Sequence, residues 1–284
     1  MPVSHDTSPP TTVIVPDMFS SIMSTIPKVN KHYEAVKIEC NLWVKQILGL
    51  SEAQYQKNLK AEFALLGSLW VPEADKDALR LVIDWLQWVF YFDDLFDDGV
   101  FKDDPEGAKR EVEGTLALMS EVEETTLETE DLSGMAFQID LPSYVIENNS
   151  VKECEDVCSD LVLLVNDALS FKKEQEMGVQ HNIINLLQHQ GLSLQQAMNQ
   201  IGVLLNDCYR RWYTSLAEMP IYGESVDREL ARYIEGCRII ALGNLHWSYA
   251  TGRYLGTQGV QVRKTRVISI GKDHTRESND LTVS

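Results

Sequence analysis

Apolar residues recur at three- and four-residue steps along most of the chain, which is the period of an amphipathic helix. This pattern predicts helices over residues 31–48, 52–70, 74–97, 107–120, 150–177, 193–219 and 226–255. Signals for β-strands are almost absent, because no extended alternation of apolar and polar residues occurs. We therefore predict an all-α fold, a single helical bundle.

The periodic pattern also predicts where the bundle begins and ends. Residues 1–17 are polar and rich in proline, and we expect them to form a flexible N-terminal lead. The helical domain spans 18–256, and residues 257–284 lack periodicity and read as a polar C-terminal tail or lid. Within the domain, the stretch 121–143 is acidic, rich in turn residues and aperiodic in its middle.

Composition narrows the class of protein. Of the 284 residues, 44% are hydrophobic, which is enough for a sizeable core, and the net charge is −18. Nucleic acid is an unsuitable partner for so acidic a chain, because binding requires lysine and arginine to neutralise phosphates. No run of 18 apolar residues exists, so we expect no membrane association. Nothing in the sequence indicates an obligatory protein partner.

The N-terminus and the cysteines indicate a cytoplasmic location. The first 17 residues contain no basic region followed by an apolar run, so they do not read as a signal peptide. The five cysteines are odd in number and scattered, and none forms a CxxC pair. This usage is typical of a reducing, intracellular environment, in which cysteines pack in the core.

Two clusters of oxygen-bearing side chains carry the candidate chemistry. Asp93 and Asp97, in the run DDLFDD, are four residues apart and share one helix face. Asn166, Ser170 and Glu174 follow at steps of four and also share a face. Hard oxygen ligands on rigid helices suit Mg²⁺, particularly when substrate phosphates complete the coordination shell. The two clusters therefore suggest a metal-dependent diphosphate site.

Bulky apolar residues precede both clusters on the same helices. Phe90, Val89 and Leu86 precede Asp93, with Trp85 and Trp88 close by, and Leu163 and Val162 precede Asn166. Bundle cores can hold sites between facing helices. A binding site for metal ions and diphosphate at the entrance of an aromatic cavity fits a substrate with a charged head and a hydrocarbon tail. Aromatic faces can also stabilise a carbocation.

Cationic and phenolic groups downstream could contact a diphosphate. Arg253 can donate two parallel hydrogen bonds to a phosphate, and Tyr254 can donate one more. Lys173, beside Glu174, is a further cationic candidate.

Together these motifs resemble those of the class I terpene synthases, of the fungal (basidiomycete-type) sesquiterpene synthases in particular. The resemblance rests on Asp93-Asp94-Leu95-Phe96-Asp97, on the Asn166/Ser170/Glu174 triad and on Arg253-Tyr254, in that order along the chain. A lone DDxxD is a weak signal, whereas the three motifs in this order are a strong one. The resemblance covers roughly residues 18–256.

The resemblance implies a terpene cyclase, a carbon–oxygen lyase that ionises and cyclises farnesyl diphosphate, with geranyl diphosphate as a possible second substrate. It implies Mg²⁺ as cofactor, with three ions per site. Asp93 would bind two ions, Asn166, Ser170 and Glu174 would bind the third, and Arg253 and Tyr254 would bind the diphosphate. Phe90 and Trp247 would line the cavity.

One departure from the family pattern bears on activity. Only 73 residues separate Asp93 from Asn166, fewer than the family normally places there, and several helices and a diphosphate-sensing arginine usually occupy this interval. Arg110 is the single arginine between 99 and 165, and its context does not match that sensor. We therefore expect an internal deletion, with some helices missing between 121 and 143.

Two alternatives remain beside the sesquiterpene synthase. The chain could be a truncated, catalytically impaired or inactive relative, as the short interval suggests. A chain-elongating prenyltransferase would use similar chemistry but requires a second aspartate-rich motif, and the second motif here is of the Asn/Ser/Glu type.

Overall fold

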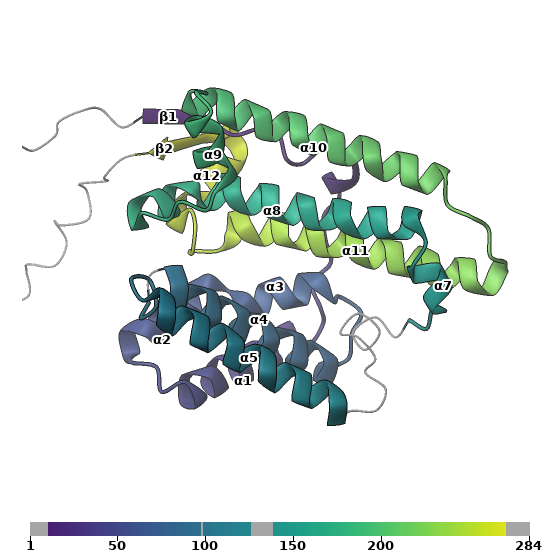
Figure 1. Cartoon of the computed structure of the whole chain (residues 1–284), viewed down its shortest axis with the longest axis horizontal. Coiled ribbons are helices and arrows are strands. Elements are labelled where there is room, and N and C mark those ends of the chain that lie inside the picture. Colours follow the sequence, from purple (N-terminus) through teal and green to yellow (C-terminus); the bar gives the residue numbers. More distant parts are fainter. Residues whose placement is uncertain (1–10, 98, 126–138, 271–284) are drawn as a thin grey trace, which may run out of the picture.

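The computed structural model describes residues 11–97, 99–125 and 139–270, and it confirms the all-α prediction over this part of the chain. Long helices lie roughly side by side in one layer, and a group of shorter N-terminal helices packs beneath them (Figure 1). The elements are η1 (Ser21–Met23), α1 (Tyr33–Ile47), α2 (Glu52–Ala61), α3 (Phe63–Trp70), α4 (Lys76–Asp97), α5 (Pro105–Thr125), α7 (Ser143–Ile146), α8 (Asn149–Met177), α9 (Ile183–His189), α10 (Leu194–Ala217), α11 (Glu224–Ala250), η2 (Gly256–Gln258) and α12 (Gly259–Thr265), with strands β1 (Thr11–Ile14) and β2 (Val267–Ile270).

Helix α8 lies at the centre of the bundle, between α10 and α11. Its apolar stripe, predicted from the three- and four-residue steps, is buried throughout: Val151, Cys154, Val157, Leu161, Leu164 and Ala168. Helix α11 also packs on α3, and α3 packs on α4, so one continuous core joins the two layers. At the C-terminal end of α4, Asp94 Oδ1 lies 3.8 Å from Nζ of Lys173 on α8.

The predicted helix over 52–70 is interrupted at Glu62. This residue takes a left-handed conformation (φ 55°), which ends α2 and starts α3 in a new direction. The carbonyls freed at the break are paired from α11 and the residue after it: the Trp247 indole Nε1 donates to the Ala61 oxygen (2.8 Å), and so does Thr251 Oγ1 (2.8 Å). Tertiary contacts therefore compensate for the lost helical hydrogen bonds, a relation that local periodicity does not reveal.

The chain ends depart from the predicted lead and tail. Strands β1 and β2 pair in antiparallel register, with Val13 opposite Ile268, and both of these side chains are buried. Gln195 of α10 accepts a hydrogen bond from the Ile14 nitrogen and donates one to the Ile14 oxygen, so α10 satisfies the strand edge. Residues 11–17 are thus part of the domain, and within the predicted tail 257–270 form α12 and β2; residues 1–10 and 271–284 lie outside the described range.

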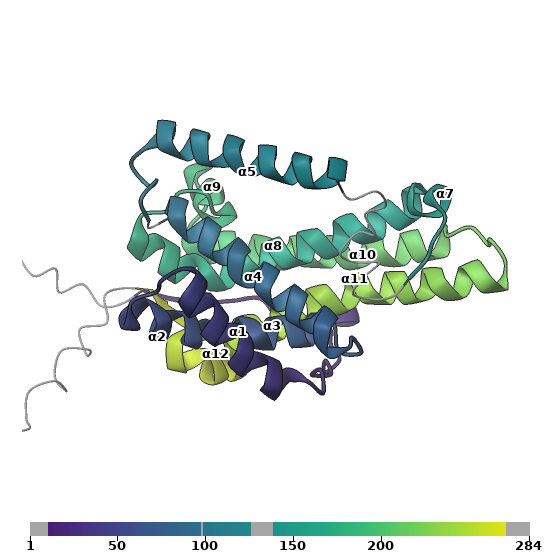
Figure 2. The same ribbon diagram turned by 90° about the horizontal axis from the view of Figure 1, so that it is seen from below.

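Helix α5 stands apart from the rest of the bundle (Figure 2). Val112, Leu116 and Leu118 are exposed, Leu118 to 65%, although all three are apolar. The prediction of missing helices between 121 and 143 falls largely on residues 126–138, which lie outside the described residues. The described part of this helix therefore presents apolar side chains to solvent.

None of the helices formed by the described residues combines the length and the apolar character needed to cross a membrane.

Candidate metal and diphosphate site

The aspartates of the first motif lie on the last turns of α4. Asp93 is the most exposed, with 58% of its side chain accessible, whereas Asp94 is 24% accessible. Partial desolvation at the end of α4 raises the pKa of Asp93 above its usual value, and the neighbouring Asp97 carboxylate raises it further. A divalent cation bound nearby would offset the repulsion between the two carboxylates. Asp93 is therefore well suited to bind a metal ion.

Asp94 is bound by cations from separate parts of the chain. Arg253 donates two parallel hydrogen bonds to it, from Nη1 to Oδ2 (3.0 Å) and from Nη2 to Oδ1 (2.7 Å). The Nζ atoms of Lys57 and Lys173 lie 3.7 and 3.8 Å from its oxygens. Burial alone would raise the pKa of Asp94, but Arg253, with help from Lys173 and Lys57, outweighs burial and holds that pKa below its usual value.

The second motif lies on the face of α8 that turns toward α4 and Tyr254. Ser170 is buried, and its Oγ has no hydrogen-bond partner among the described residues. A buried hydroxyl without a partner costs free energy, and a bound cation is one way to satisfy it. Together with Asn166 and Glu174 it forms a set of hard oxygen donors, so the residues present fit a divalent metal such as Mg²⁺.

Arg253 and Tyr254 connect the two motifs. Helix α11 ends at Ala250, earlier than the predicted 255, so both residues lie in the segment that follows it. Arg253 contacts Asp94 on α4, while the Tyr254 hydroxyl accepts a hydrogen bond from Asn166 Nδ2 on α8 (2.8 Å). This short segment, in which Tyr254 is buried, therefore joins the two motifs to each other across the bundle.

Asn182, which the sequence analysis did not identify, contacts Glu174, the last residue of the second motif. Its Nδ2 donates to Glu174 Oε2 (2.9 Å) and to the Asp167 backbone oxygen (2.9 Å). Asp167 in turn accepts a hydrogen bond from the Ile183 nitrogen, and burial raises its pKa to about 6. The available sequence signal was an asparagine directly before the apolar pair Ile183-Ile184, the pattern of a helix N-cap.

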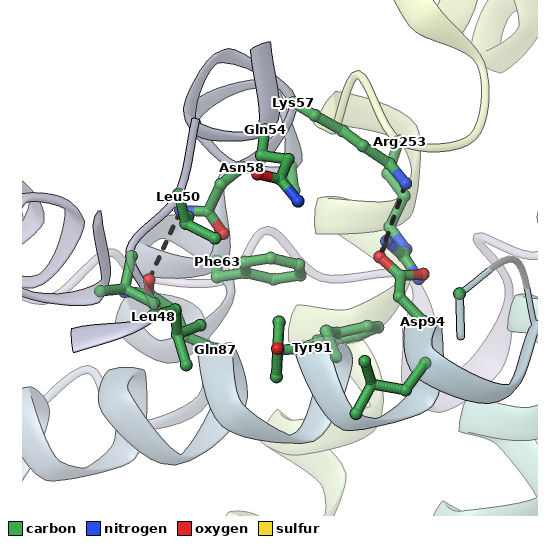
Figure 3. Close-up of a pocket in the computed structure, with 15 residues that line it drawn as sticks. Leu48, Leu50, Gln54, Lys57, Asn58, Phe63, Gln87, Tyr91, Asp94 and Arg253 are labelled. Carbon is green, nitrogen blue, oxygen red and sulfur yellow. Dashed lines mark hydrogen bonds and ion pairs between the residues drawn. The ribbon is translucent and has the colours of Figure 1, made fainter. Parts of the chain in front are cut away.

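A pocket of about 350 Å³ borders this site on the side of α1 and α2. Figure 3 shows the Phe63 ring across its middle, with Arg253 and Asp94 paired at one end. The amides of Gln54, Asn58 and Gln87 add polar groups to a largely apolar lining. The Asp94–Arg253 pair lines the pocket, whereas the metal-ligand candidates Asp93, Asn166, Ser170 and Glu174 do not.

The aromatic residues singled out in the sequence differ in their exposure to solvent. Trp247 is completely buried and packs against Phe90, with ring centroids 5.5 Å apart. Phe90 also stacks on Phe63 (4.6 Å) and lies beneath the Arg253 guanidinium, 5.0 Å away. Trp85, by contrast, is 38% exposed. Phe90 therefore lies directly against the charged Arg253 guanidinium.

Over residues 11–97, 99–125 and 139–270, no group of three or more His, Cys, Asp and Glu side chains is arranged to hold a metal ion. The candidate ligands instead combine aspartates with asparagine, serine and glutamate from a second helix. The geometry thus defines a class of protein: a helical bundle with two facing oxygen-donor motifs and an adjoining arginine and tyrosine.

Comparison with known proteins agrees with this class. Residues 125–211 match the family model described as terpene synthase family 2, C-terminal metal binding. The chain is 37% identical to a (+)-eremophilene synthase of Gibberella fujikuroi, over 92% of this chain and 93% of the relative. It is 32% identical to an inactive (1R,4R,5S)-(-)-guaia-6,10(14)-diene synthase of the same fungus, over 92% and 86%.

A solved structure shows the same fold. The linalool/nerolidol synthase of Streptomyces clavuligerus, in complex with 2-fluorogeranyl diphosphate, superposes with a TM-score of 0.62 at 16% identity, over 83% of this chain and all of that one. The chain belongs to the class I terpene synthase family, among the fungal sesquiterpene synthases. It is a terpene cyclase by family.

The alignment with the eremophilene synthase also bears on the short interval between the motifs. It runs over 333 residues, whereas the whole chain has 284. The alignment must therefore include positions of the relative at which this chain has no residue. Arg110, the single arginine between 99 and 165, lies on α5 and is exposed to solvent.

Proposed function

We propose that this chain is a sesquiterpene synthase that cyclises farnesyl diphosphate and releases diphosphate, with Mg²⁺ as its metal. The observation that carries the proposal is the connection of Asp94 on α4 to Arg253 and of Asn166 on α8 to Tyr254, which brings all three motifs to one end of the bundle. Family membership supports a prenyl diphosphate as the substrate class.

In this proposal the ligands are Asp93 on one side and Asn166, Ser170 and Glu174 on the other. Bound there, the ions would neutralise charge on the departing diphosphate, which is the chemistry that a divalent metal supplies. The resemblance implies that this ligand set holds three ions per site. The exposed Asp93 carboxylate and the unpartnered Ser170 hydroxyl are the two groups that gain most from binding.

Arg253 and Tyr254 would bind the diphosphate itself. Arg253 already directs its two Nη atoms to the end of α4, where they donate to Asp94. A diphosphate oxygen is an equally good acceptor for a planar guanidinium, so substrate can compete for these hydrogen bonds. Stabilising the charge that develops on the leaving group lowers the barrier to breaking the carbon–oxygen bond.

The allyl cation formed by ionisation would react within an apolar, aromatic environment. Phe90 is the best-placed ring, because it lies beneath Arg253 and between Phe63 and Trp247. Ring faces stabilise a desolvated cation by about 2 kcal/mol. Exclusion of water from this region determines whether the cation cyclises or is quenched.

A second candidate function is an impaired or inactive synthase. Two observations favour it: the alignment is longer than the chain, and the apolar residues Val112 and Leu118 of α5 are exposed. We place the missing positions in the interval between the two motifs, 98–166. A cavity with an incomplete wall would admit water.

Incubation of the purified chain with farnesyl diphosphate and Mg²⁺, followed by gas chromatography and mass spectrometry of the volatiles, tests the proposal. A cyclic hydrocarbon supports the synthase, and an acyclic alcohol such as farnesol supports an enzyme that ionises substrate but admits water. Longer prenyl diphosphates would indicate chain elongation. No consumption of farnesyl or geranyl diphosphate would overturn the proposal in favour of the inactive relative.

A further inference from the structure

Asn182 occupies a buried position at the start of α9, next to the second motif. It is 1% exposed, and its Oδ1 accepts a hydrogen bond from the Ile184 nitrogen (2.9 Å), so it is the N-cap of this helix. This bond fixes which end of the amide is oxygen, because a backbone N–H can only be matched by an acceptor. The Nδ2 group is therefore directed at α8.

Both hydrogens of that amide nitrogen are used on α8. One reaches Glu174 Oε2 and the other the Asp167 backbone oxygen, each at 2.9 Å. The Asp167 side chain accepts from the Ile183 nitrogen (2.8 Å), which attaches the same end of α9 to α8 a second time. The first turn of α9 is thus held against the motif at two neighbouring points.

The connection between the two helices is short enough to hold this geometry. Helix α8 ends at Met177, and Gly178 takes a positive φ of 78° that lets the chain turn back. The Val179 nitrogen then donates to the Glu174 oxygen (2.9 Å), so the backbone of Glu174 is tied to the turn as well. Few conformations are left for the segment that carries Asn182.

Glu174 is the most flexible residue of the motif, since a glutamate side chain must order several torsions before it can bind a metal. Its hydrogen bond from Asn182 occupies Oε2 and leaves Oε1 as the free ligand atom. Partners of this kind orient metal ligands, and their loss typically weakens metal affinity by about 10- to 100-fold. On the proposed function, on which this step rests, we infer that Asn182 is a positioning residue that presents Glu174 to the metal.

The inference separates Asn182 from an ordinary helix cap. A cap that only stabilises α9 affects the folding of the chain and leaves metal affinity unchanged. A residue that acts through Glu174 affects metal affinity, and its effect disappears once Glu174 can no longer bind metal. Asn148, the N-cap of α8, supplies the matched control, because its side chain accepts from the Ser150 nitrogen (2.9 Å) at the far end of that helix.

The test measures binding of inorganic pyrophosphate by calorimetry at increasing Mg²⁺ concentration, on the full chain. Asn182→Ser keeps a capping hydroxyl but is too short to reach Glu174. We expect the Mg²⁺ concentration at half-maximal binding to rise by about 10- to 100-fold, and Asn148→Ser to leave it unchanged. Asn182→Asp, which keeps the side-chain volume and removes the donor, provides a second variant if the serine variant unfolds.

A double-mutant cycle with Glu174→Gln completes the test. If Asn182 acts through Glu174, adding Asn182→Ser to Glu174→Gln causes no further loss of Mg²⁺ affinity. Wild-type affinity in both Asn182 variants, or an equal loss in Asn148→Ser, would overturn the positioning role and leave the proposed function standing. Failure of the wild-type chain to bind pyrophosphate with Mg²⁺ would instead refute the proposed metal site, and the role of Asn182 with it.

Discussion

Arg253 and Asp94 share two parallel hydrogen bonds of 3.0 and 2.7 Å, although 159 residues separate them along the chain. The arginine side chain is 6% exposed and the aspartate 24%. The pair therefore fixes the segment after α11 against the end of α4. It also leaves Arg253 charged, since the Asp94 carboxylate raises its pKa despite burial.

Replacing Asp94 is expected to lower the unfolding free energy more than replacing Arg253. Asp94→Asn leaves a buried guanidinium whose other carboxylate, Asp93, is 3.8 Å away and largely exposed, so we expect a loss of about 3 kcal/mol of unfolding free energy. Arg253→Gln leaves Asp94 beside Lys57 and Lys173, so its cost is smaller. Urea denaturation followed by circular dichroism measures both.

Arg228→Gln is the control for that comparison, because the Arg228–Glu224 pair is largely exposed and is expected to contribute less than about 1 kcal/mol. Equal losses in Asp94→Asn and Arg228→Gln would show that the Asp94–Arg253 pair does not hold the two segments together.

Trp247 stabilises the break between α2 and α3. Its indole nitrogen donates to the Ala61 oxygen at 2.8 Å and to the Glu62 oxygen at 3.1 Å. Trp247→Phe keeps an aromatic ring but removes the donor, and we expect it to lower the unfolding free energy by about 2 kcal/mol. The same change at Trp85, which is 38% exposed, is expected to have a much smaller effect. Comparable melting temperatures for the two variants would contradict this role.

The strand pair is part of the domain core. Val13 is 1% exposed, whereas its neighbour Ile14 is 51% exposed. We expect Val13→Ala to lower the unfolding free energy by about 2 kcal/mol and Ile14→Ala to change it by less than about 0.5 kcal/mol. Thermal melts of the two variants give the comparison, and an undiminished stability of Val13→Ala would show that β1 is dispensable.

Most of the thiols are expected to be unreactive in the folded chain. Cys40, Cys154, Cys158 and Cys208 are buried, and burial raises the pKa of each, to about 11 for Cys154 and for Cys208. Thiolate is the reactive form, so these groups should not react with Ellman's reagent at pH 8. We expect at most one rapid equivalent, from the partly exposed Cys237, and five after denaturation. Two or more rapid equivalents would contradict the burial of these four thiols.

Periodicity predicted the helices well because their apolar faces repeat regularly, as the buried stripe of α8 illustrates. It did not predict the break at Glu62, where hydrogen bonds from α11 make an unfavourable backbone conformation tolerable. The β1–β2 pair was missed for a related reason. Each strand has four residues, too few for alternation to be recognised, and its partner lies at the other end of the chain.

The sequence predicted those parts of the candidate site whose residues lie close together along the chain. Asn166, Ser170 and Glu174 lie on one helix, so their spacing alone places them on one face. The contacts that organise the site are not local: Arg253 with Asp94, Tyr254 with Asn166, and Asn182 with Glu174. These depend on how α4, α8, α9 and the end of α11 pack together.

The most direct test of the central claim is diphosphate release from farnesyl diphosphate with Mg²⁺, for the wild-type chain and for Asp93→Ala and Asn166→Ala. One residue comes from each motif, so both must contribute if the two motifs form one site. The account predicts release by the wild-type chain that ceases with EDTA and falls at least about 100-fold in each variant. Release at the wild-type rate in either variant would contradict it.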